Sequence, residues 1–289
     1  MGLSPAQIKG RIKSLAAKSH ADARALMRIY MMERFLERIA MSEHKDCFII
    51  KGGILVTAMV GVAMRSTLDI DTTIINFELN EENAFRIIKE ICSVQLDDGV
   101  SFSVTKVESI MDEMEYPGIR LHLDSLCGGL KTPIKIDIST GDVITPRAID
   151  YHYKLMLEEK YISLWSYNLE TVIAEKLQTI LARDDANTRM RDFYDVNMLF
   201  IQYKDRIDPH VLEQAYAATC KKRGTLYLIN NWSTSLKKIA ASELLIVLWE
   251  NYKAKYQYAS GIMYSNVIES IWELFSLMKR NTSLRVLKK

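Results

Sequence analysis

Two carboxylates stand one residue apart in the segment RSTLDIDTT, where Asp69 and Asp71 flank Ile70. The segment alternates as a strand does, so both side chains should lie on one face, about 7 Å apart. Two like charges at this spacing repel each other and lose solvation. We therefore expect a cation between them, and carboxylate oxygens suit the hard divalent ion Mg²⁺, or Mn²⁺ in its place.

A third carboxylate fits the same pattern in TPIKIDIST. Its isoleucines at 134, 136 and 138 predict a core-facing side, which leaves Asp137 on the opposite side. If this strand lies beside the first, Asp137 joins Asp69 and Asp71 in a site for Mg²⁺, which takes substrate phosphates as further ligands. The alternative for an isolated D-x-D is a solvent-facing polar strip of a strand.

The glycine pair Gly52 and Gly53 favours the metal-site interpretation. A glycine turn before a helix leaves backbone N–H groups available at the helix N-terminus, where a phosphate can approach without obstruction. A glycine turn, a helix and a D-x-D strand in succession are together typical of nucleotidyl transfer.

A lysine occupies an unexpected position in NLETVIAEKLQTILAR. The helical period predicts one apolar face made of Leu169, Val172, Ile173, Leu177 and Ile180. Lys176 falls in the middle of that face, and Arg183 projects in nearly the same direction. A buried lysine needs a partner. Either its stem reaches the surface or it pairs with a structural carboxylate, or it neutralises the phosphates of a triphosphate, which we favour. For Arg183, a structural role and a phosphate-binding role are equally favoured.

Asp192 lies at the border of the apolar stripe of the next predicted helix, in NTRMRDFYDV. It is either an ion-pair partner of Arg189 or a functional acid.

The composition is that of an ordinary globular protein: 48% hydrophobic, 26% charged and a net charge of +2. The total charge does not indicate a nucleic-acid binder by itself. The scattered cysteines predict reduced thiols, and the apolar run 54–64 is too short to span a bilayer. We expect a soluble cytoplasmic protein without a membrane span.

The order of elements predicts an α+β fold. Helices are expected near 5–15 and 21–40, followed by a strand, the glycine turn and helix, the D-x-D strand, a helix from Glu81 and three strands separated by turns such as EYPG. From about Tyr151 the pattern is almost wholly helical. This predicts a domain over 1–150 and a helical domain over 151–289.

These segments resemble the AbiEii/AbiGii toxin family, which comprises nucleotidyltransferase-fold toxins of toxin–antitoxin and abortive-infection systems. The resemblance covers residues 48–195 and rests on KGG…RSTLDID, YPGIRLHLDSLCGG…IKIDISTGDVITPR and YNLETVIAEKLQTILAR…NTRMRDFYD. It implies a polymerase-β-like mixed sheet with flanking helices, followed by an all-helical C-terminal half that contributes Lys176 and Asp192 to the cleft.

The resemblance also implies roles for individual residues. Asp69 and Asp71, with Asp137, would hold the metal. The residues expected to bind the nucleotide are Gly52, Gly53, Arg65, Ser66, Thr67 and Arg183. Lys176 would meet the leaving pyrophosphate, and either Asp137 or Asp192 would position or deprotonate the attacking hydroxyl.

The implied substrates are an NTP, with GTP as one candidate, and the tRNA 3′ end, and a cognate antitoxin is expected to be encoded alongside. We expect a monomer. The alternatives are transfer to a small molecule or a protein side chain, or GTP binding without catalysis. A tRNA acceptor requires a basic strip, for which the candidates are Lys221, Lys222, Arg223, Lys237, Lys238, Lys279, Arg280, Arg285, Lys288 and Lys289. Solvated helix ends and a frayed tail would explain these clusters equally well.

Overall fold

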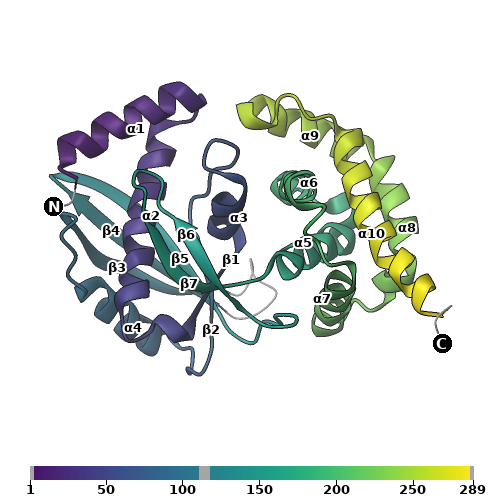
Figure 1. Cartoon of the computed structure of the whole chain (residues 1–289), viewed down its shortest axis with the longest axis horizontal. Coiled ribbons are helices and arrows are strands. Elements are labelled where there is room, and N and C mark those ends of the chain that lie inside the picture. Colours follow the sequence, from purple (N-terminus) through teal and green to yellow (C-terminus); the bar gives the residue numbers. More distant parts are fainter. Residues whose placement is uncertain (1–2, 111–117, 287–289) are drawn as a thin grey trace. The chain divides into compact units, whose positions relative to one another are not determined.

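The computed structural model describes residues 3–110 and 118–286 and divides into two compact units (Figure 1). Unit 1 comprises Met1–Asp142 and Ala148–Tyr167. Unit 2 comprises Val143–Arg147 and Asn168–Lys289.

Unit 1 contains the sheet and the N-terminal helices. Its elements in chain order are α1 Pro5–Ser19, α2 Ala23–Met41, η1 Lys45–Cys47, β1 Phe48–Lys51, α3 Gly52–Val60, β2 Ile70–Ile74, α4 Glu81–Ser93, β3 Val100–Ile110, β4 Gly118–Cys127, β5 Leu130–Ser139, β6 Ile149–Lys154 and β7 Tyr161–Ser166. Local signals explain the helix starts. Ser4 and Gln7 form a capping box on α1, and Asn80 caps α4 as its sequence predicts.

In the described part of the chain, seven strands form one mixed sheet in the order β3-β4-β5-β2-β1-β7-β6. The central strand β2 runs antiparallel to β1 and parallel to β5. The alternation of β5 is as predicted, because Ile134, Ile136 and Ile138 are buried in the core. Helix α2 packs against β5 and β7, and α3 packs against β1 and β2.

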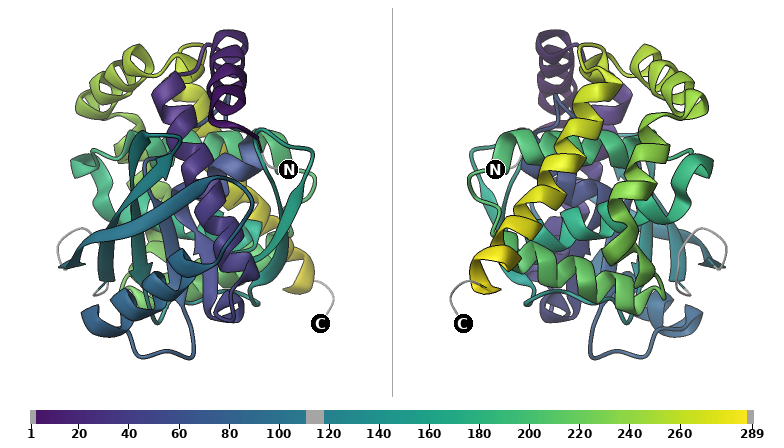
Figure 2. Two further views of the ribbon diagram at one scale, coloured as in Figure 1. Left: turned by 90° about the vertical axis from the view of Figure 1, so that its left-hand side faces the viewer. Right: turned by 90° about the vertical axis from the view of Figure 1, so that its right-hand side faces the viewer.

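Unit 2 is helical. Its elements are α5 Leu169–Arg183, η2 Asp184–Ala186, α6 Met190–Tyr203, α7 Pro209–Lys222, α8 Tyr227–Ala240, α9 Glu243–Lys255, η3 Gln257–Ala259 and α10 Tyr264–Val286. The long helix α10 runs beside α8 (Figure 2), and the ring of Phe275 on α10 stacks on Trp232 of α8 with centroids 4.6 Å apart. Such aromatic pairs bury large apolar areas and so hold the helices together.

Residues 151–166, at the start of the segment that we expected to be almost wholly helical, are not helical. These residues form most of β6 and all of β7, which pair with each other, and β7 also pairs with β1. The two units divide after Asp142, after Arg147 and after Tyr167, so unit 2 is not one continuous segment. The predicted turn residues 115–117 lie outside the described residues.

None of the helices within the described ranges combines the length and the apolar character needed to cross a membrane.

Candidate active site

The glycine pair forms the first two residues of α3, directly after β1, and close packing requires both glycines. Gly52 has a φ of +58°, and a Cβ atom there would lie 2.1 Å from Oδ2 of Asp71. A Cβ atom on Gly53 would lie 2.4 Å from the Thr67 hydroxyl. No other residue type fits either position without displacing the neighbouring side chain.

The three predicted acids come together beside these glycines. One carboxylate oxygen from each of Asp69, Asp71 and Asp137 lies within 4.8 Å of the other two. Strand β2 begins at Ile70, so Asp69 directly precedes the strand, whereas Asp71 lies within it. The N–H of Gly53 donates to Asp71 Oδ2 at 2.9 Å, and the Thr67 hydroxyl donates to Asp69 Oδ1 at 3.0 Å. One N–H group that we expected to serve a phosphate thus binds an acid instead.

The electrostatics of the three acids favour a cation. Burial, together with the charges of Asp69 and Asp137, raises the pKa of Asp71 to about 6, although the Gly53 hydrogen bond and Lys51 act in the opposite direction. A divalent cation among these oxygens would remove the repulsion, and an all-oxygen donor set suits Mg²⁺ or Mn²⁺. Asp69, Asp71 and Asp137 therefore fit a hard divalent ion.

Arg120 is a site residue that sequence reasoning missed. On β4 it lies opposite Asp137 of β5, and its Nε and Nη2 donate to Oδ1 and Oδ2 of Asp137, each at 2.8 Å. The only available signal was its place in the alternating segment GIRLHLDSL, on the same side as the other polar residues.

A second missed group surrounds Lys51, which pairs in register with Asp71. Lys51 Nζ lies 2.6 Å from both the Ser139 hydroxyl and Asp142 Oδ2. Burial alone would raise the pKa of Asp142, but the ammonium of Lys51 lowers it overall. Lys51 therefore has its own carboxylate partner and approaches Asp71 as a neighbouring charge.

The predicted nucleotide-binding residues Arg65, Ser66 and Thr67 follow α3. Arg65 is buried, and its Nη1 donates to the Gly53 carbonyl at 2.7 Å and lies 3.2 Å from the Thr57 hydroxyl. Arg65 thus stabilises the glycine turn from within, while nucleotide contact by these three residues stays a prediction.

Unit 2 holds the other predicted catalytic residues in a buried ionic cluster. Lys176 Nζ of α5 lies 2.8 Å from Asp192 Oδ1 and 2.7 Å from Asp195 Oδ2, both on α6, and Arg189 binds the second oxygen of Asp192. Burial would raise the pKa of Asp192, but Lys176 and Arg189 together lower it. The carboxylate partner considered for Lys176 is therefore present, and Asp192 has the predicted ion pair with Arg189. Asp195 was not predicted, although it follows Asp192 by three residues on the same helix.

The remaining predicted cations differ in their surroundings. Arg183 at the end of α5 is exposed. Arg223 donates to the Gln178 side chain at 2.6 Å, and Lys238 pairs with Asp184 and Asp185. These two members of the proposed basic strip thus have structural partners. The side chains beyond Lys279 lie outside the described residues.

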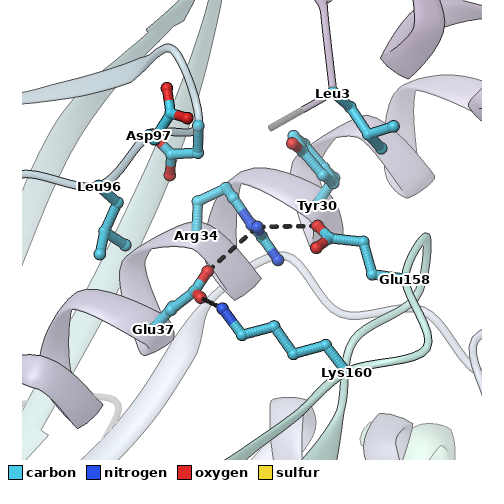
Figure 3. A pocket seen from close by; sticks show the side chains of 9 residues that line it. Leu3, Tyr30, Arg34, Glu37, Leu96, Asp97, Glu158 and Lys160 are labelled. Atoms are coloured by element: carbon cyan, nitrogen blue, oxygen red, sulfur yellow. Dashed lines mark hydrogen bonds and ion pairs between the residues drawn. The ribbon is translucent and has the colours of Figure 1, made fainter. Parts of the chain in front are cut away.

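A cavity of about 260 Å³ also lies in unit 1, and its lining includes none of the predicted site residues (Figure 3). Arg34 of α2 joins Glu37 and Glu158 there, at 3.0 and 2.9 Å, and Lys160 pairs with Glu37. These ion pairs attach α2 to the turn between β6 and β7.

Three acids at the centre of a mixed sheet, beside two glycines that open a helix, are the arrangement expected of a nucleotidyltransferase. Two solved structures from Helicobacter pylori share this fold at 15% identity. The first is a proposed nucleotidyltransferase, with a TM-score of 0.52 over 92% of this chain and 98% of that one. The other is JHP933, with a TM-score of 0.51 over 93% and 99%. A search of curated proteins finds no match.

The model of the nucleotidyl transferase AbiEii toxins of type IV toxin–antitoxin systems matches residues 34–270. The chain belongs to this family, and it is therefore a nucleotidyltransferase of the toxin–antitoxin class.

Proposed function

We propose that this toxin moves a nucleotide from an NTP to the 3′ end of tRNA in a reaction that depends on Mg²⁺ or Mn²⁺. The observation that carries the proposal is the meeting of Asp69, Asp71 and Asp137 beside the Gly52–Gly53 turn. The acids would hold the ion, which would supply charge neutralisation on the triphosphate when bound.

The reaction forms one bond and breaks another. The hydroxyl oxygen of the acceptor bonds to the α-phosphorus, the bond from this phosphorus to the bridging oxygen of the β-phosphate breaks, and pyrophosphate leaves. The hydroxyl proton passes to a carboxylate, either Asp137 or Asp192. The glycine turn and residues 65–67, with Arg183, would contact the nucleotide, and Lys176 would stabilise the leaving pyrophosphate.

Membership of a toxin–antitoxin family implies a cognate antitoxin, which we expect to be encoded beside the toxin. We also propose that the toxin works as a cytoplasmic monomer. Since nucleotidyl transfer to tRNA would stop translation, this acceptor explains toxicity directly. GTP is the first nucleotide to test.

The test uses the purified protein, Mg²⁺, total tRNA and each α-³²P-labelled NTP in turn. Asp69→Asn and Asp71→Asn should abolish labelling, because each removes a charged ligand. Glu82→Gln, which neutralises an exposed carboxylate on α4, should label as the wild type does. Periodate oxidation of the tRNA 3′-terminal diol, and EDTA, should each prevent labelling.

Two results would contradict the proposal. Labelling that survives Asp71→Asn or EDTA would exclude the metal-dependent site. Absence of labelled tRNA with all four NTPs would exclude this acceptor, and labelling of a protein or a small molecule in the same reactions would then identify the alternative.

A further inference from the structure

Four charged residues form a single row across the centre of the sheet. Arg120 on β4 pairs in register with Asp137 on β5, Asp137 with Asp71 on β2, and Asp71 with Lys51 on β1. Directly paired residues of neighbouring strands share one face. The row therefore reads positive, negative, negative, positive across β4-β5-β2-β1.

The two cations of the row are engaged differently. Lys51 donates to Asp142 and Ser139 and acts on Asp71 as a neighbouring charge. Arg120 instead binds an acid of the triad directly, with one N–H to each oxygen of Asp137. The side chains of Arg120 and Asp137 are only 16% and 6% exposed, so solvent screens this pair little.

A two-point contact between a guanidinium and a carboxylate fixes the orientation of the carboxylate as well as its distance. A guanidinium that donates side-on to both oxygens holds the plane of the carboxylate, which a point charge cannot do. Each oxygen retains a second lone pair, so Asp137 can keep both hydrogen bonds and still serve as a ligand.

We propose that Arg120 is a positioning residue of the active site: its two hydrogen bonds orient Asp137 so that this carboxylate shares a divalent cation with Asp69 and Asp71. The proposal rests on the metal-dependent activity proposed above. If Arg120 only competed with the cation for Asp137, its removal would strengthen metal binding. If it orients Asp137, its removal weakens binding, so the sign of the change separates the two roles.

The experiment measures Mn²⁺ binding to the full chain by electron paramagnetic resonance, without nucleotide or tRNA. Arg120→Met should weaken the affinity about 10-fold, the usual effect of removing a group that orients a metal ligand. Arg120→Lys should weaken Mn²⁺ binding by nearly as much as Arg120→Met does, because a lysine keeps the positive charge but cannot make the two-point contact. Lys131→Met, which breaks the Asp124–Lys131 pair between the same two strands, is the matched control and should bind Mn²⁺ as the wild type does.

Thermal unfolding of each variant separates orientation from a purely structural role. A lower melting temperature with unchanged Mn²⁺ affinity in Arg120→Met would overturn the proposal. Tighter binding in that variant, or wild-type affinity in Arg120→Lys, would also overturn it, as would a wild type that binds no Mn²⁺. If the variants weaken Mn²⁺ binding as expected but the wild type never labels tRNA, the tRNA acceptor fails while the role of Arg120 stands.

Discussion

Gly52 and Gly53 show how single residues determine this site. Because Gly52 has no side chain, the start of α3 lies close to Asp71, and the Gly53 N–H donates to the Asp71 carboxylate. The contact also places the positive end of the α3 dipole at the acid. The glycine pair therefore contacts the acid triad directly, a role that its position in the sequence did not indicate.

Replacing Gly52 by alanine should remove the metal site. The left-handed backbone alone should cost about 1–2 kcal/mol of unfolding free energy, and the new methyl group must also displace the Asp71 carboxylate. We expect Mn²⁺ affinity to fall more than about 10-fold, since orienting groups have effects of this size. The measurement is a Mn²⁺ titration combined with urea unfolding.

Gly129→Ala provides the control. Gly129 has a φ of +78°, but nothing lies within 4 Å of a Cβ atom built there. This variant should lose unfolding free energy through the left-handed backbone but bind Mn²⁺ as the wild type does. Equal Mn²⁺ affinities in both alanine variants would contradict the proposed reason for Gly52.

At the scale of elements, helix α2 holds the turn after β6 through the buried carboxyl group of Glu33. Both oxygens of Glu33 accept the Met156 N–H at 3.0 Å, and burial raises the pKa of Glu33 to about 8, with Arg34 and the Tyr153 hydroxyl acting in the opposite direction. Glu33 therefore keeps its proton at neutral pH in the folded protein. The stability that it contributes is fully present below about pH 4.5, the value for an exposed glutamate, and is lost as the pH rises toward 8.

Glu33→Gln removes this titration and keeps a carbonyl oxygen for Met156. At pH 5 the variant should be slightly less stable than the wild type, by about 1 kcal/mol, because its amide introduces a buried donor. The difference should shrink and reverse by pH 8, as measured by urea unfolding at pH 5, 6.5 and 8. The exposed Glu82→Gln variant should differ from the wild type by the same amount at each pH. A constant difference for Glu33→Gln would contradict the raised pKa.

Lys176 ties α5 to α6 by binding Asp192 and Asp195. Lys176→Met leaves two buried carboxylates without this cation, so unfolding should cost about 3 kcal/mol less. Lys238→Met breaks exposed pairs, which solvent screens, and should lower the stability far less than Lys176→Met does. A Lys176→Met variant as stable as the wild type would contradict the structural role. If a Lys176 variant loses activity, its stability must be measured as well before the loss is attributed to a missing contact with the leaving pyrophosphate.

For the molecule as a whole, Glu33 and Lys176 lie in different units and have different hydrogen-bond and ion-pair partners. The stability effects of Glu33→Gln and Lys176→Met should therefore add within about 0.5 kcal/mol in the double variant, as for independent sites. Urea unfolding of the four proteins at one pH measures the coupling. A coupling energy above about 1 kcal/mol would mean that the two sites are not independent.

Sequence periodicity predicted the sheet core and the acid triad, because strands β2 and β5 alternate regularly and their isoleucines leave the acids on one face. It failed for β6 and β7. The segments IDYHYK and YISLWS are short and carry many polar residues, and only pairing with β1 through β7 fixes them as strands. Arg120 was missed for a related reason, since its importance comes from the register with Asp137 and not from its own segment.

The short segment Val143–Arg147 belongs to unit 2, although the residues on both sides of it belong to unit 1. It is held there by the Asn168 amide, which donates to the carbonyls of Thr145 and Arg147 at 2.8 and 3.0 Å. The chain thus passes between the units three times. As a result, no single cut in the gene yields both units whole, and a protease that cleaves after Tyr167 leaves the segment 143–147 of the helical unit covalently attached to the sheet.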